Sequence, residues 1–243
     1  MKKLQALIRY EFETTFKYIF LFYAICYSVI ALVYLLILIL QGHFEDAGTS
    51  CLDMNSLVFL SIISSVGFTE DFRMHIQNGF TRKYIFIGTT SLFAAMALTM
   101  SLIDTLVANL MQYLTGNYHS VFTSLYGNAQ PWILSWLWLF VLYLCACCLC
   151  YFITLVINRI GGRLFLIISL GGALFISLSL SVLFRLVLPA AMIENIIRIL
   201  EMLFGFMTNG GIQVFYPILL FSSLSTIIML SNYHLIKRME IKR

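Results

Sequence analysis

Residues 69–83, TEDFRMHIQNGFTRK, form the longest charged and hydrogen-bonding interval in the middle of an otherwise apolar chain. Thr69 can cap the free amides of a helix, and the two acids that follow it place negative charge at the positive end of the helix dipole. Asn78 and Gly79 together are a stop signal, since glycine readily adopts the left-handed conformation that ends helices. The pattern predicts a short helix, with Thr81 capping the helix that follows it.

The composition of the rest of the chain is typical of a membrane protein. Of the 243 residues, 61% are hydrophobic and 11% are charged, whereas a soluble domain carries about 25% charged residues. Apolar runs long enough to cross a bilayer of roughly 30 Å recur along the chain, which favours helices over a barrel of alternating strands. The first run is too long for a cleavable signal, so we expect the N-terminus to be retained.

We predict a single all-α transmembrane domain over 1–243, with six spans and both termini in the cytoplasm. Residues 1–17 repeat apolar side chains at helical spacing and are expected to lie in the inner interface as an amphipathic helix. Residues 69–83 follow the second span on the cytoplasmic side. Residues 190–208 begin after Pro189 and are too polar to span, so we expect an outer interfacial or re-entrant helix there. The six predicted spans are 18–40, 52–68, 84–110, 131–157, 164–188 and 212–236.

The distribution of positive charge sets the orientation of these spans. With both termini inside, 13 of the 15 Lys and Arg residues fall on the cytoplasmic side, and only Arg185 and Arg198 lie near the outer side. This asymmetry supports the number of spans and their direction together, because a wrong number would scatter the cations. The cytoplasmic set is Lys2, Lys3, Arg9, Lys17, Arg73, Arg82, Lys83, Arg159, Arg163, Lys237, Arg238, Lys242 and Arg243.

Familiar catalytic and cofactor motifs are missing from the sequence. It contains no Gly-Lys dipeptide and hence no GxxxxGK[ST] loop for ATP, and its four His residues form no HExxH pair. Cys145, Cys147, Cys148 and Cys150 share one predicted span, but they project on two faces of the helix, so packing explains them better than a soft-metal site. We therefore predict no catalytic, metal or cofactor site in this chain.

Ionisable side chains also occur where the pattern predicts apolar surroundings. Asp104 lies 20 residues beyond Tyr84, and Arg185 lies 22 residues beyond Arg163, which places them about 30 and 33 Å along their helices, near the outer boundary. We hypothesise a structural or gating ion pair between these two residues; the alternative is that each charge snorkels separately. Glu11 projects on the apolar side of the N-terminal helix, where we favour snorkelling to the headgroups over pairing with an inner-loop Arg.

Small residues form one stripe of the predicted fifth span. Ser169, Ala173, Ser177 and Ser181 recur every four residues, which is the spacing of one helix face. Small side chains on one face let another helix approach closely. The partner helix could belong to this chain or to a second copy, and the sequence leaves both alternatives open.

With these features the chain resembles the membrane subunit of type-2 ATP-binding-cassette (ABC) exporters, a permease made separately from its ATPase. Its most specific motif is EDFR followed by QNGFTRK within 70–83, similar to the QNG-Ser/Thr-Arg-Lys run that small permeases of this family often carry. The chain lacks the fused ATPase and the large outer domain of bigger relatives. The resemblance implies that this segment is a coupling helix that docks in a groove of the ATPase. The implied contacts are Glu70, Asp71, Phe72, Arg73, Ile76, Gln77, Asn78, Gly79 and Arg82.

The resemblance also implies a function. A permease of this kind moves an amphipathic or hydrophobic cargo, such as a peptide, bacteriocin, drug or lipid, out of the cell across a bacterial plasma membrane. It works with two ATPase subunits that bind Mg-ATP and with a second permease, either another copy or a related chain, surrounded by membrane lipid. Nucleic acid is not an expected partner. The alternative is a non-transporting membrane module for peptide-antibiotic sensing or immunity, and an intramembrane enzyme would need convergent polar residues at mid-depth.

Overall fold

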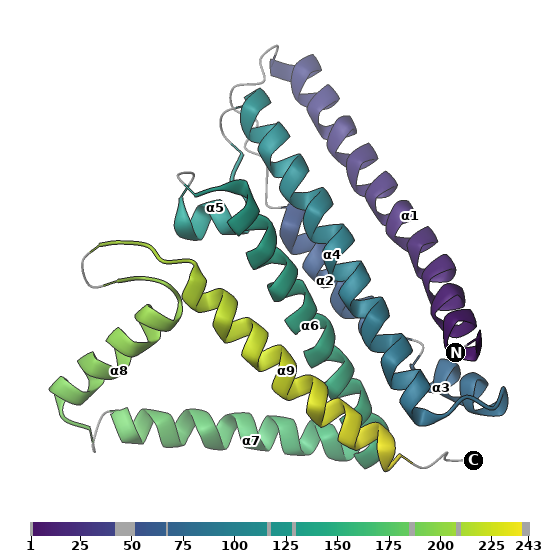
Figure 1. Cartoon of the computed structure of the whole chain (residues 1–243). Helices are drawn as coiled ribbons and strands as arrows, with labels where there is room; N and C mark the ends of the chain where they lie inside the picture. The colour runs from purple at the N-terminus through teal and green to yellow at the C-terminus, as the bar shows by residue number, and fades with distance from the viewer. Residues whose placement is uncertain are drawn as a thin grey trace.

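The computed structural model describes residues 2–41, 52–66, 68–115, 118–127, 130–184, 188–207 and 210–239. Nearly all of them are helical, and Figure 1 shows the helices in order along the chain. Their bounds are α1 (Lys2–Gln41), α2 (Leu52–Ser65), α3 (Phe68–Gln77), α4 (Arg82–Thr115), α5 (Val121–Tyr126), α6 (Trp132–Ile160), α7 (Gly162–Val182), α8 (Ala190–Leu203) and α9 (Phe215–Lys237).

The lengths of these helices are those of a multi-pass membrane protein. Within the described residues, α1, α4, α6, α7 and α9 are each long and apolar enough to cross a membrane. The predicted second span corresponds to α2, which has 14 residues and is therefore only about 21 Å long, shorter than the hydrocarbon core of a bilayer. The prediction of an all-helical fold is confirmed for the described residues. Helix α5, which has six residues, was not predicted from the sequence.

The core of the molecule is built around α6, which packs against α2, α4 and α9. Figure 1 shows α6 running between α4 and α9. Side chains from all four helices are fully buried there, including Leu60, Met96, Leu155 and Ile236. Cys147 lies in the same core at 0% exposure. The close packing of these apolar side chains fixes α6 as the central support of the bundle.

Helix α1 is continuous from Lys2 to Gln41, whereas the sequence analysis divided it into an interfacial helix and a first span at residue 17. The stretch contains no glycine or proline that would break a helix. Arg9 and Glu13 lie one turn apart on the exposed side of the helix and form an ion pair of 2.7 Å. This pair stabilises the helical conformation of the N-terminal part of α1. One continuous helix therefore joins both parts.

The N-terminal part of α1 lies against α4 at Gly88. Leu7 is 3% exposed, and its side chain occupies the space that a Cβ atom at Gly88 would need. Glycine at this position therefore allows a close approach of the two helices.

Gly88→Val is expected to displace Leu7 and lower the stability of the bundle by about 1–3 kcal/mol, the usual cost of overpacking. The measurement is the thermal unfolding midpoint of the purified protein in detergent. Gly172→Val is the matched control, because nothing lies near a Cβ at that glycine of α7. An equal midpoint for Gly88→Val and Gly172→Val would contradict the close approach.

The predicted helix within 69–83 is present as α3. It begins at Phe68, one residue before the expected cap, and ends at Gln77. Gly79 has a φ of 74°, as the predicted stop requires, and the Thr81 hydroxyl accepts a hydrogen bond from the Tyr84 amide at 3.4 Å. The predicted stop at Gly79 and the predicted cap at Thr81 are therefore confirmed.

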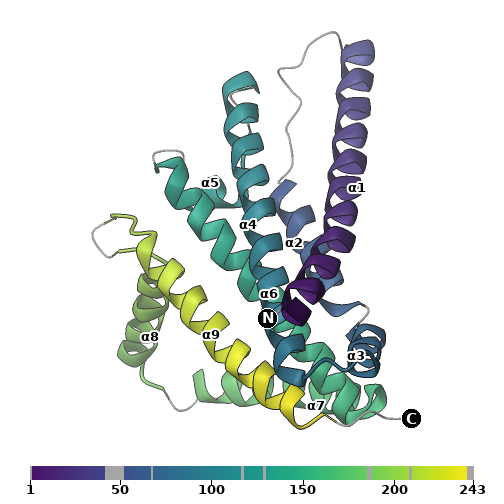
Figure 2. The same ribbon diagram turned by 45° about the vertical axis from the view of Figure 1, so that its right-hand side comes forward.

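Helix α7 leaves the bundle at an angle after a turn at Gly161, which has a φ of 98° (Figures 1 and 2). No described residue of α7 is buried, although most of its side chains are apolar. Helix α8 follows and is held through α5, since the Tyr126 hydroxyl donates to the Phe204 carbonyl at 2.9 Å. Burial raises the pKa of Tyr126, which keeps this hydroxyl protonated and able to donate.

Candidate functional site

Helix α3 has one face against the bundle and one face open. Phe72 and His75 are 5% and 4% exposed, and Ile76 packs against the core beside them. The predicted ATPase contacts on the open face are Asp71, Arg73, Gln77, Asn78, Gly79 and Arg82. The side chain of Glu70 lies outside the described part of the structure. The structure thus divides the predicted contact set: Phe72 and Ile76 hold the helix from inside, and the polar residues face outward.

Arg82 connects this segment to the end of the chain. Its Nη1 atom donates to the carbonyl oxygen of Lys237 at 2.7 Å. This carbonyl lies at the C-terminus of α9, where carbonyl groups lack partners within the helix and the dipole favours a cation. Arg82 therefore ties the start of α4 to the end of α9.

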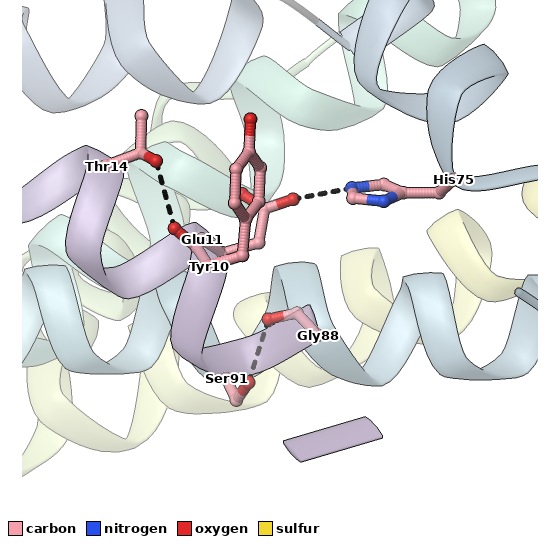
Figure 3. A network of polar contacts seen from close by, with 6 residues as sticks. All are labelled: Tyr10, Glu11, Thr14, His75, Gly88 and Ser91. Carbon is pink, nitrogen blue, oxygen red and sulfur yellow. Dashed lines mark hydrogen bonds and ion pairs between the residues drawn. The ribbon is translucent and has the colours of Figure 1, made fainter. Parts of the chain in front are cut away.

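Glu11 of α1 and His75 of α3 are in direct contact, as Figure 3 shows. Glu11 Oε1 lies 2.8 Å from His75 Nε2, and the two side chains are 17% and 5% exposed. The ring of His75 also meets Phe80 edge to face at 5.7 Å. The expectation that Glu11 snorkels to the headgroups is therefore wrong. Its partner is a histidine, which became available because α3 folds back beneath α1.

A cavity of about 500 Å³ lies behind α3, between that helix and α1, α2, α4 and α6. Glu11, Asp71 and His75 line its α3 end, and Asp71 is at the same time exposed on the outside of α3. The remaining wall is mainly aromatic and aliphatic, and no Lys or Arg is among the described residues that line it. The sequence analysis did not predict this cavity, because its walls come from five separate helices.

Asp104 forms a second polar cluster, within the bundle. It is 2% exposed, and its two carboxylate oxygens accept hydrogen bonds from the hydroxyls of Tyr23 at 2.9 Å and Tyr143 at 2.7 Å. Arg185, the predicted ion-pair partner, lies outside the described residues, so that pair stays a prediction. The two tyrosine partners come from α1 and α6, and no local pattern in the sequence marks them.

Asp53 lies beside this cluster and was not identified from the sequence as a site residue. Its Oδ2 accepts from the Val121 amide at 3.0 Å, in the first turn of α5, and its backbone carbonyl lies 3.1 Å from the Tyr143 hydroxyl. Its Oδ1 has no hydrogen-bond partner among the described residues. The two aspartates and two tyrosines join α1, α2, α4 and α6, which makes this cluster a structural link between helices.

The remaining sequence candidates fall elsewhere. Ser169, Ala173, Ser177 and Ser181 are exposed on α7, and two of these serines donate to carbonyls of their own helix. None of these four side chains is buried against another described helix of the chain, and the partner of the stripe stays a prediction. In the described part of the chain, no group of three or more His, Cys, Asp or Glu side chains could hold a metal ion.

Comparison of the chain with protein-family models, with curated proteins and with solved structures finds no match.

Proposed function

We propose that this chain is the permease subunit of an ABC exporter and that a separate ATPase subunit docks on the open face of α3. The observation that carries the proposal is the division of α3 into a buried face, anchored by Phe72 and His75, and an exposed face of mixed charge. A short helix held in this way can be pushed by a partner without losing its own contacts. The resemblance of the EDFR and QNGFTRK motifs to this family supplies the identity of the partner.

The connections of α3 provide a route for mechanical coupling. Phe72 and Ile76 join it to the core, His75 joins it to Glu11 on α1, and the turn at Gly79 joins it to α4. ATP binding would close the ATPase pair and move α3, and this motion would reach α1 and α4 as rigid bodies. The outcome is an opening of the route through the membrane for an amphipathic or hydrophobic cargo.

A second permease completes the proposed assembly. Helix α7 is apolar, unburied, and carries the exposed small-residue stripe that allows close helix approach. A second copy or a related permease would cover α7, and membrane lipid would cover the rest. Both ATPase subunits would then lie on the side of α3, in the cytoplasm of a bacterial cell.

Arg73→Glu and Gly79→Pro are expected to reduce binding of the ATPase subunit at least about tenfold. The first reverses an exposed charge on the docking face, and the second places proline where φ is 74°, a conformation that proline cannot adopt. The measurement is co-purification of the ATPase with the affinity-tagged full-length chain from membranes. Arg163→Glu is the control, since it reverses an exposed charge at the start of α7.

The result separates the two candidate functions. Retention of full binding in both α3 variants would place the interface elsewhere. Failure of the unaltered chain to bind any ATPase would contradict the exporter and favour the non-transporting module for peptide-antibiotic sensing or immunity, which needs no such subunit.

A further inference from the structure

Exposed Lys and Arg side chains gather at one end of the molecule, where α4 and α7 begin and where α6 and α9 end. Figures 1 and 2 both show these four helix ends at the lower end of the bundle, near the C-terminus. The side chains of this cationic cluster come from three separate stretches of the sequence, so the fold brings them together. The members of the cluster are Arg82, Lys83, Arg159, Arg163, Lys237 and Arg238.

Contacts between the helices set the level of these side chains. Arg82 donates to the carbonyl oxygen of Lys237 at 2.7 Å, which places the start of α4 at the end of α9. The rings of Phe93 on α4 and Tyr151 on α6 meet with their centroids 5.3 Å apart. Arg82 lies about three turns before Phe93 along α4. Arg159 lies about two turns after Tyr151 along α6, which runs in the opposite direction, so the two arginines lie at a similar level.

Described acidic side chains do not neutralise the cluster. Neither of the ion pairs formed among the described residues includes any of its members. Arg82 uses one nitrogen to bind the carbonyl of Lys237, a neutral group, and so keeps its full charge. Arg159 and Arg163 flank the turn at Gly161, and both are exposed. Like charges held together attract an anion, and the planar guanidinium group suits phosphate, which it binds through two parallel hydrogen bonds.

An exposed apolar surface begins directly at the cluster. Helix α7 starts at Gly162 and has no buried residue among those described. Ile167, Leu174 and Leu178 lie on one of its faces and are 68%, 64% and 65% exposed. The small-residue stripe lies on a different face, so a second permease on that stripe would leave these side chains available. A ligand that fits both surfaces has an anionic phosphate at one end and hydrocarbon chains at the other, which is the chemistry of an anionic phospholipid.

We propose that the cationic cluster binds the headgroup of an anionic phospholipid, whose acyl chains lie along α7. Arg159 and Arg163 hold the phosphate, and the Lys and Arg side chains at the ends of α4 and α9 add to the attraction. The bound lipid supports the angle at which α7 leaves the bundle, because no buried side chain of α7 does so in the described structure. This binding requires neither an ATPase nor a second permease and is independent of the proposed exporter function.

Native mass spectrometry of the purified full-length chain in a neutral detergent measures the binding. The probe is dioleoylphosphatidylglycerol, a lipid with a negatively charged headgroup. Dioleoylphosphatidylcholine has the same acyl chains without net charge, and glycerol phosphate has an anionic headgroup without the chains. We expect phosphatidylglycerol to bind at least about tenfold more tightly than either comparison, since each basic side chain near an anionic lipid contributes about fivefold.

A pair of double variants locates the lipid. Arg159→Gln with Arg163→Gln removes two charges of the cluster and should weaken phosphatidylglycerol binding about twenty-five-fold, the product of two fivefold losses. Lys17→Gln with Arg198→Gln removes the same net charge at exposed positions of α1 and α8, outside the cluster, and should leave the binding unchanged. Because all four side chains are exposed, both variants should keep the thermal unfolding midpoint of the unaltered chain.

Equal binding of phosphatidylcholine would show that charge does not select the lipid, and equal binding of glycerol phosphate would show a phosphate site in which α7 has no role. Undiminished phosphatidylglycerol binding in the Arg159 and Arg163 double variant would place the lipid elsewhere. An equal loss in both double variants would assign the binding to net charge alone and overturn the site. Because no ATPase is present in the assay, these outcomes are distinct from a failure of the ATPase to bind α3.

Discussion

Asp104→Leu is expected to lower the free energy of unfolding by about 2–4 kcal/mol. The substitution removes the nearer acceptor of two buried hydroxyls, those of Tyr23 and Tyr143. Their other acceptors are backbone carbonyl oxygens that lie farther away, that of Met100 at 3.3 Å and that of Asp53 at 3.1 Å. Loss of a hydrogen bond to a carboxylate costs about 1.5–3 kcal/mol. The effect should be large because these hydrogen bonds join α4 to both α1 and α6. The measurement is the denaturant or thermal unfolding of the purified protein in detergent.

The decrease in the free energy of unfolding should be larger when the substitution at position 104 removes more hydrogen-bond acceptors. Asp104→Asn keeps one carbonyl oxygen and should lose less than the leucine variant. Leu102→Ala, at a 41% exposed position of the same helix, should change stability little. An Asp104→Leu protein as stable as Leu102→Ala would contradict the importance of the cluster.

Double variants identify the partners of Asp104. The loss of stability from Asp104→Leu and Tyr143→Phe together should be smaller than the sum of the two single losses, since both remove the same 2.7 Å hydrogen bond.

The predicted ion pair between Asp104 and Arg185 has an analogous test. Asp104→Asn and Arg185→Gln should share one functional loss, and independent losses would show that the pair does not exist.

Phe72→Ala is expected to release α3 from the bundle, with a local cost of about 3–5 kcal/mol. The ring is 5% exposed and belongs to the core, so its removal takes away most of the apolar contact that holds this ten-residue helix. A helix this short is marginal without tertiary packing. Hydrogen exchange of the amides of 68–77 should therefore become faster, while exchange in α6 stays slow.

The same variant also tests the coupling proposal. If α3 is the docking helix, Phe72→Ala should weaken ATPase binding although the side chain does not face the partner. Gln77→Ala, at an exposed position of α3, is the control for hydrogen exchange. Unchanged protection of 68–77 in Phe72→Ala would show that Phe72 does not anchor the helix.

Local signals predicted the secondary structure around α3 well. Gly79 and Thr81 act through their own backbone and their immediate neighbours, so their roles can be deduced from residue type and spacing alone. The division at residue 17 was wrong because charge marks where a helix would meet the headgroups and does not break the helix. Glycine and proline do break helices, and residues 2–41 contain neither.

The sequence by itself determined the membrane class, the all-helical composition and the position of the short polar helix, because each depends on hydrophobicity and on near neighbours along the chain. Only the tertiary structure decided that Phe72 faces inward, that Glu11 meets His75, and that Asp104 meets two tyrosines. The partners in these contacts lie 39 to 81 positions apart in the chain. No periodic pattern in the sequence reveals contacts between residues so far apart along the chain. These contacts follow from the way α1, α3, α4 and α6 pack against one another.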